Sequence, residues 1–105
     1  MTTDKLKART KQFALRVIKV VAALPKSIQG RAVANQLVRC GTSVVAKIGV
    51  VLEEADDTQL WLELIIEAKL IPVKRVQPLL NEASELVAIF VASRKSAASN
   101  LRSAI

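Results

Sequence analysis

The fold is decided by a long stretch without proline between Pro25 and Pro72. Residues 28–70 of this stretch read IQGRAVANQLVRCGTSVVAKIGVVLEEADDTQLWLELIIEAKL. Mostly apolar residues recur in it every three or four positions, at Val33, Leu37, Cys40 and Val44 and then at Ile48, Val51, Ala55, Thr58, Leu62, Ile65 and Lys69. This spacing places the recurring residues on one face of an α-helix and does not fit the alternation of a β-strand.

The middle of this stretch allows two interpretations. The steps from Cys40 to Val44 and from Val44 to Ile48 are both four residues, an offset known in coiled coils as a stutter. Weak helix formers surround it, at residues 41–43 and 49. Either residues 28–70 form one helix of about 65 Å, or the chain turns near residues 41–43. We expect the continuous helix, because the apolar stripe never lapses.

A helix is predicted on each side of the central stretch. Residues 4–24 carry a stripe of the same spacing, formed by Leu6, Thr10, Phe13, Val17, Val20 and Leu24, and Pro25 ends it. Ser27 can cap the following helix. Residues 70–77 form a connector, and Pro78 suits the first turn of a last helix over residues 78–98, with Leu79, Ala83, Leu86, Phe90 and Ala97 as its core stripe. The sequence thus predicts an all-α bundle with one domain over residues 1–105.

Composition argues against catalysis and against a metal or cofactor site. Histidine, the most frequent general base and metal ligand, is absent, and Cys40 is the single cysteine. Asp56, Glu63 and Glu67 point away from the core stripe, so a metal site inside the bundle is not expected. No apolar run approaches the ~20 residues of a membrane span, and no secretory signal is recognisable. We expect a cytoplasmic protein that is not an enzyme.

Several sequence blocks resemble a known family of helical bundles. They are residues 13–17 (FALRV), 23–25 (ALP), 35–44 (NQLVRCGTSV), 52–58 (LEEADDT), 61–64 (WLEL) and 79–83 (LLNEA). In this order they resemble the small four-helix-bundle proteins encoded by 23S ribosomal RNA intervening sequences, a family that includes the accessory protein of diversity-generating retroelements. The resemblance implies a four-helix bundle, ring-like pentamers, and association with ribosomal RNA elements or with a reverse transcriptase.

The chain departs from that family after Val44. There the family continues to the end of its second helix, through a basic turn and into its third helix, whereas this chain passes directly to residues 45–48. A deletion at this point would fuse helices 2 and 3. Because a fused helix cannot fold back on itself, each half would expose part of its core, and two chains would complete each other's bundle by exchange. The sequence therefore predicts a domain-swapped dimer or a higher homo-oligomer.

The charge is unevenly distributed along the chain. Residues 1–47 hold ten Lys or Arg and one acid, which gives +9, and residues 48–92 hold three Lys or Arg and eight acids, which gives −5. On a helical wheel four basic residues of the first helix lie within about 80° of one another, and two more lie on one side of the second. These six are Lys5, Arg9, Arg16, Lys19, Arg31 and Arg39. We interpret them as contacts for nucleic-acid phosphates; the alternative is a solvated face, or one paired with acids of another helix.

Four apolar residues lie off the predicted core. Leu15 and Ile18 in the first helix, and Leu60 and Leu64 in the acidic stretch, point outward and are candidates for an interface between subunits. Together these features favour an oligomeric bundle that binds structured RNA, or an RNA–protein complex, through its basic N-terminal half. The alternative is a self-assembly or protein-interaction module that binds no nucleic acid.

Overall fold

The protein is an all-α bundle, as the sequence predicts. The computed structural model describes residues 3–44 and 51–104, and within these ranges every regular element is an α-helix. The four helices are α1 (Thr3–Ala23), α2 (Ile28–Ser43), α3 (Val51–Glu67) and α4 (Val73–Ala104). In this part of the chain no helix is long and apolar enough to cross a membrane.

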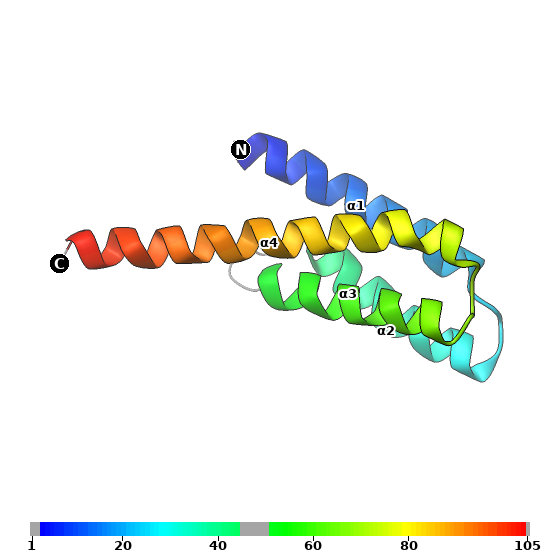
Figure 1. The fold of residues 1–105 in the computed structure, drawn as a ribbon. Helices are drawn as coiled ribbons and strands as arrows, with labels where there is room; N and C mark the ends of the chain where they lie inside the picture. Colours follow the sequence, from blue (N-terminus) through cyan, green and yellow to red (C-terminus); the bar gives the residue numbers. More distant parts are fainter. Residues whose placement is uncertain (1–2, 45–50, 105) are drawn as a thin grey trace.

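The helices form a closed ring of four. Each helix packs on the next in the chain and α4 packs back on α1, whereas the backbones of the diagonal pairs α1–α3 and α2–α4 do not approach each other closely. Figure 1 shows that consecutive helices run in opposite directions, so the α1–α2 and α3–α4 connections lie at the same end of the bundle. The molecule is elongated, with extents of 54 × 22 × 21 Å.

The prediction of one continuous helix over residues 28–70 is wrong. Helix α2 ends at Ser43, and α3 packs alongside α2 in the opposite direction (Figure 1). The chain thus reverses direction between these two helices, and residues 45–50, which join them, lie outside the described residues. The apolar stripe could not reveal it, because both helices keep a core-facing stripe whether they are fused or folded back. The predicted domain swap depended on this fused helix. Because the four helices of one chain form the complete ring, the structure gives no reason for two chains to exchange helices.

The predicted core stripes are buried in all four helices. Phe13 and Val17 of α1, Leu37 of α2 and Leu62 of α3 are completely buried, and so is Leu86 of α4. Around them pack partly buried residues that the stripes also contain, among them Leu6, Val20, Val33 and Phe90. Of the stripe positions whose side chains the structure describes, only Lys69 is exposed.

Lys69 is exposed because α3 has already ended. The helix stops at Glu67, and Lys69 adopts a left-handed backbone conformation with φ 57°. The N–H of Leu70 donates to the carbonyl of Ile65 at 3.1 Å, and the N–H of Lys69 donates to Ile66 at 3.1 Å. This pair of bonds is the Schellman motif, which satisfies the last carbonyls of a helix. The α3–α4 connection therefore begins two residues before the sequence predicts.

Helix α4 is longer at both ends than predicted. It starts at Val73 instead of Pro78 and continues to Ala104 instead of residue 98. Pro78 lies in the second turn, where its missing N–H removes one backbone hydrogen bond near the helix start. With 32 residues, α4 is about 48 Å long, and the 16 residues of α2 span about 24 Å. As a result, the C-terminal part of α4 projects beyond the α2–α3 pair (Figure 1).

Candidate nucleic-acid interface

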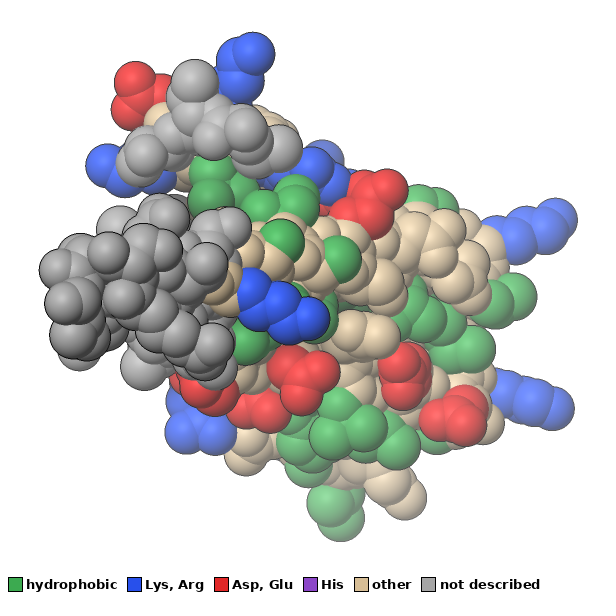
Figure 2. Space-filling view, turned by 60° about the vertical axis from the view of Figure 1, so that its left-hand side comes forward, with side chains coloured by type: hydrophobic (Ala, Val, Ile, Leu, Met, Phe, Trp, Pro, Cys, Tyr) green, Lys and Arg blue, Asp and Glu red, His purple; other side chains and the backbone are tan. Residues whose placement is uncertain are grey.

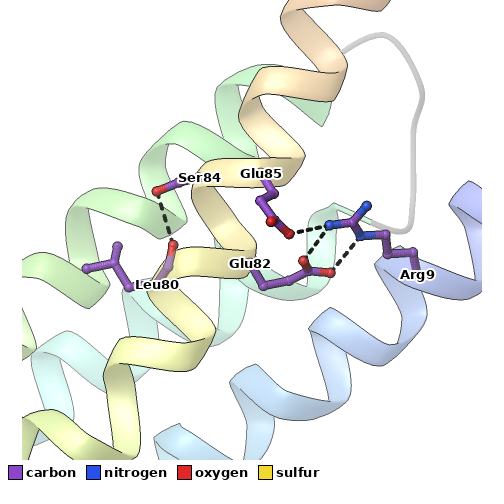
Figure 3. Close-up of polar contacts among 5 residues, drawn as sticks. All are labelled: Arg9, Leu80, Glu82, Ser84 and Glu85. Carbon is purple, nitrogen blue, oxygen red and sulfur yellow. Dashed lines mark hydrogen bonds and ion pairs between the residues drawn. The ribbon is translucent and has the colours of Figure 1, made fainter.

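Arg9, a predicted phosphate contact, is engaged by two acids of the same chain. Its Nε donates to Glu82 Oε2 at 2.8 Å and its Nη2 donates to Glu82 Oε1 at 2.6 Å, and Nη2 also lies 2.7 Å from Glu85 Oε2 (Figure 3). The side chains of Arg9 and Glu82 are only 27% and 16% exposed. A bidentate pair between arginine and a carboxylate is stronger, and more restricted in geometry, than an ion pair with a single hydrogen bond. Arg9 thus links α1 to α4.

The same contact changes the ionisation of both partners. Hydrogen bonds from Arg9 lower the pKa of Glu82 below its ordinary value, against the opposing effect of burial, and the positive charges of Arg9 and Arg16 act in the same direction. The hydrogen bond to Glu82 raises the pKa of Arg9 further above its already high value. Arg16 is half-buried on the same side of α1. Arg9 therefore pairs with acids of another helix, as the alternative interpretation of the basic face expects.

The other four predicted contacts do not form one surface. Lys5, Lys19, Arg31 and Arg39 are all exposed. Lys19 and Arg31 lie toward the end of the bundle that holds the two connections, whereas Lys5 lies near the start of α1 and Arg39 near the end of α2 (Figure 1). Arg39 also donates from Nη2 to Gln36 Oε1 at 2.8 Å. The folded chain splits the predicted basic face between the two ends of the molecule.

The structure assembles a different basic surface at the end with the two connections. We call this surface, residues 19–31 and 67–75, the connection end. It contains six basic residues and one acid, Glu67, a local charge of +5. The basic residues are all exposed, and none forms an ion pair with another residue in the described part of the chain; they are Lys19, Lys26, Arg31, Lys69, Lys74 and Arg75.

Two helix starts add to the positive potential of the connection end. Helices α2 and α4 both begin there, and neither has an acidic residue in its first turn. The N-terminus of a helix carries a partial positive charge that favours anions. Helix α2 is held in place by Ser27, the predicted cap, whose hydroxyl accepts from the N–H of Gly30 at 3.0 Å. Gly30 approaches the Pro25 carbonyl so closely that a side chain would not fit.

A small pocket joins α1 to the start of α4 at this end. It is lined by three apolar residues, Val20, Ala23 and Ile71, and by the basic residues Lys19 and Arg75. Its volume is about 100 Å³. That is well below the roughly 300 Å³ at which small-molecule sites begin, so the pocket has room for a phosphate group or a few water molecules and not for a nucleobase with its sugar.

Sequence reasoning missed four of the six basic residues at the connection end. Lys69, Lys74 and Arg75 belong to a segment whose net charge is negative, and Lys26 lies in a loop outside the helical wheels. The signal that could have found them was topological. In an up-and-down bundle, the first and third connections meet at one end, so the basic residues near Pro25 and near Pro72 become neighbours.

Among residues 3–44 and 51–104, no group of three or more His, Cys, Asp or Glu side chains could hold a metal ion. Cys40 is buried and is not part of a disulfide, and burial raises the pKa of its thiol.

The four apolar residues predicted to face outward are exposed. Leu15, Ile18, Leu60 and Leu64 are between 38% and 52% exposed, so their predicted outward orientation is confirmed.

Comparison with known proteins yields a fold relationship. No protein-family model matches the chain, and no curated protein sequence matches it. Among solved structures, the chain is similar to a protein of unknown function from the S23 ribosomal protein family of Bacteroides thetaiotaomicron. The TM-score is 0.74 at 23% sequence identity, over 83% of this chain and 95% of that one. The four-helix fold is therefore shared with a member of the S23 ribosomal protein family.

Proposed function

We propose that this protein binds structured RNA through the connection end and catalyses no reaction. The observation that carries the proposal is the concentration of six exposed basic residues, with one acid, at the end where α2 and α4 begin. Lys and Arg side chains that contact phosphates release condensed counterions, and this release drives binding to nucleic acids. The name of the S23 ribosomal protein family agrees with an RNA partner.

The expected contacts are to the phosphate backbone and not to unstacked bases. Residues 19–31 and 67–75 contain no Phe, Trp or Tyr, and recognition of single strands depends on aromatic side chains on which bases stack. The basic residues are spread over the end of a bundle with a cross-section of 22 × 21 Å. A surface of that width can reach phosphates of both strands of a helical RNA, which proteins recognise mainly by shape and backbone.

The test compares two variants that change the same types of residue on the same two helices. The Arg31→Glu/Lys74→Glu variant removes two basic residues from the connection end. The Arg39→Glu/Lys95→Glu variant makes the same change in net charge on exposed residues of α2 and α4 away from that end. Fluorescence anisotropy with a labelled RNA hairpin, at several salt concentrations, measures affinity and its salt dependence.

If the connection end binds RNA, the two variants should differ clearly in their affinity for RNA and in its salt dependence. Six phosphate contacts would give a slope of log K against log salt of roughly −4 to −5, and the Arg31/Lys74 variant should lose about two units of that slope and at least roughly tenfold in affinity. The Arg39/Lys95 variant should bind almost as tightly as the wild type. Equal weakening in both variants would mean that net charge alone attracts RNA, and the proposed surface would be wrong.

A second candidate function is a self-assembly or protein-interaction module without nucleic-acid binding. The observation that favours it is the use of Arg9 within the fold, together with the exposed apolar residues of α1 and α3. If the wild type fails to bind the RNA hairpin even at low salt, this second function replaces the first.

A further inference from the structure

The connection end carries two exposed apolar side chains that the proposed RNA contacts do not use. Ile28 is the first residue of α2, and Val73 is the first residue of α4. Ile28 is 88% exposed and Val73 is 50% exposed. Among the large apolar side chains of the described residues, Ile28 is the most exposed. Contacts to a nucleic-acid backbone come from basic and polar groups, so these two side chains need another explanation.

The stability of α2 does not explain Ile28. The preferred residues at the start of a helix are proline and acidic residues, which suit the positive end of the helix dipole. Because Ser27 is the cap of α2, Ile28 occupies the first helical position. An apolar residue that packs back on its own helix as a hydrophobic staple lies before the cap instead. The high exposure of Ile28 agrees with this, since a stapled side chain would be partly covered.

Both side chains point off the end of the bundle. In an α-helix the bond from Cα to Cβ is tilted toward the N-terminus of the helix. Because α2 and α4 both begin at the connection end (Figure 1), the side chains of Ile28 and Val73 lean outward from that end. Pro25 and Pro72, in the two connections, are exposed at the same end.

Basic residues surround these apolar side chains. Lys26 and Arg31 flank Ile28, and Lys74 and Arg75 directly follow the first residue of α4; all four basic residues are exposed. Figure 2 shows basic side chains that project at the right-hand edge of the molecule, toward the connection end, with hydrophobic side chains between them. The connection end therefore combines a local charge of +5 with protruding apolar side chains.

The positions of the two apolar side chains favour a membrane over a protein as the ligand. Helices α2 and α4 are diagonal in the ring of four, and their backbones do not approach each other closely. Ile28 and Val73 therefore form two separate contact points instead of one patch. A protein partner would need an apolar pocket opposite each point, with acidic residues around both. A membrane with anionic lipids offers an apolar layer beneath negative charge at every point of its surface.

We infer that the connection end binds the surface of membranes that contain anionic lipids, with the bundle standing on its end. Ile28 and Val73 enter the boundary between the headgroups and the acyl chains, while the surrounding basic residues contact lipid phosphates. Burial of apolar surface thus adds to the attraction between opposite charges. The inference goes beyond the proposed RNA binding but shares its six basic residues, so RNA and the membrane should compete for this end.

Vesicle co-sedimentation tests the inference. Vesicles of phosphatidylcholine alone are compared with vesicles that also contain phosphatidylglycerol, and the wild type should sediment only with the second kind. The Ile28→Gln/Val73→Gln variant removes both apolar side chains and leaves the charge unchanged. It should lose roughly tenfold or more in its partition onto the anionic vesicles, because the burial of two exposed apolar side chains contributes at least that much. Its affinity for the RNA hairpin should equal that of the wild type.

Matched variants separate the contributions of apolar surface and charge. The Leu15→Gln/Leu60→Gln variant removes two exposed apolar side chains from the middle of α1 and α3, and it should sediment like the wild type. The Arg31→Glu/Lys74→Glu variant should lose binding to both the vesicles and the RNA hairpin. An excess of the RNA hairpin should release the wild type from the vesicles. Circular dichroism must show the same helix content in all proteins.

Several results would overturn the inference. One is a wild type that does not sediment with anionic vesicles. Another is an Ile28→Gln/Val73→Gln variant that binds the vesicles like the wild type, since net charge alone would then attract the protein. Equal losses in the Leu15→Gln/Leu60→Gln variant, or an equal loss of RNA affinity in the Ile28→Gln/Val73→Gln variant, would also contradict it.

The two proposals can fail separately. A wild type that binds anionic vesicles through its apolar side chains but does not bind the RNA hairpin supports the inference and contradicts the proposed function. A wild type that binds RNA but no vesicles does the reverse.

Discussion

Gly41 of α2 faces Val17 of α1 with no room for a side chain. A Cβ atom at Gly41 would lie 2.6 Å from Cγ1 and 2.9 Å from Cγ2 of Val17. Val17 is completely buried and β-branched, so it has little freedom to turn away. Gly41→Ala should therefore strain the α1–α2 contact, although alanine is the better helix former.

The expected size of this effect follows from two opposing contributions. Overpacking a buried contact costs about 1–3 kcal/mol, and replacing glycine by alanine inside a helix gains up to about 1 kcal/mol. Gly41→Ala should therefore lower the free energy of unfolding by up to about 2 kcal/mol. Val17→Ala alone should cost about 2 kcal/mol through the cavity that it leaves. In that background the methyl group that Gly41→Ala adds fills the space, so the second change should stabilise the protein.

The assay is a double-mutant cycle by urea unfolding, followed by circular dichroism. The wild type, both single variants and the Val17→Ala/Gly41→Ala variant give an interaction free energy that should exceed about 1 kcal/mol, the range found for residues in direct contact. The reasoning is refuted if Gly41→Ala has the same effect in both backgrounds. It is also refuted if Gly41→Ala alone stabilises the wild type, since the close approach to Val17 would then be absent.

Further predictions concern the α1–α4 ion pair and the ends of the helices. Glu82→Gln should lower the free energy of unfolding by about 1–3 kcal/mol, because it weakens charged hydrogen bonds to Arg9. Folding lowers the pKa of Glu82 below its ordinary value of 4.5. The loss of stability in the Glu82→Gln variant should therefore be complete above pH 4.5 and should shrink as the pH falls through the pKa of Glu82 in the folded protein. Urea titrations of both proteins from about pH 7 to about pH 3 measure this difference. Lys69→Gly should raise the melting temperature through a gain of up to about 1 kcal/mol, because glycine adopts the left-handed conformation without cost, and a Lys69→Ala control should show no such gain. Ser27→Ala should cost about 1 kcal/mol by removing the cap of α2, and Ser27→Asp, which restores an acceptor, should recover most of it in the same melting experiment.

Local sequence patterns determined the helical class and the direction in which most side chains point. The spacing of Phe13, Val17, Leu37 and Leu62 predicted burial, and all four are buried. The same wheels predicted that Leu15 and Leu60 face outward, and they do. These predictions succeed because the direction of a side chain around a helix depends only on its position along that helix.

The tertiary structure alone decided where the chain reverses and which charges meet. An apolar stripe has the same spacing in one long helix and in two helices that fold back on each other, so periodicity could not separate α2 from α3. Arg9 and Glu82 are 73 residues apart and become partners only because α4 closes the ring on α1. For the same reason Lys19 and Arg75 share a pocket, and the basic surface lies at the connection end instead of along the N-terminal half. Charge and hydropathy patterns describe each helix by itself, whereas neighbours in space depend on the direction in which each helix leaves the previous one.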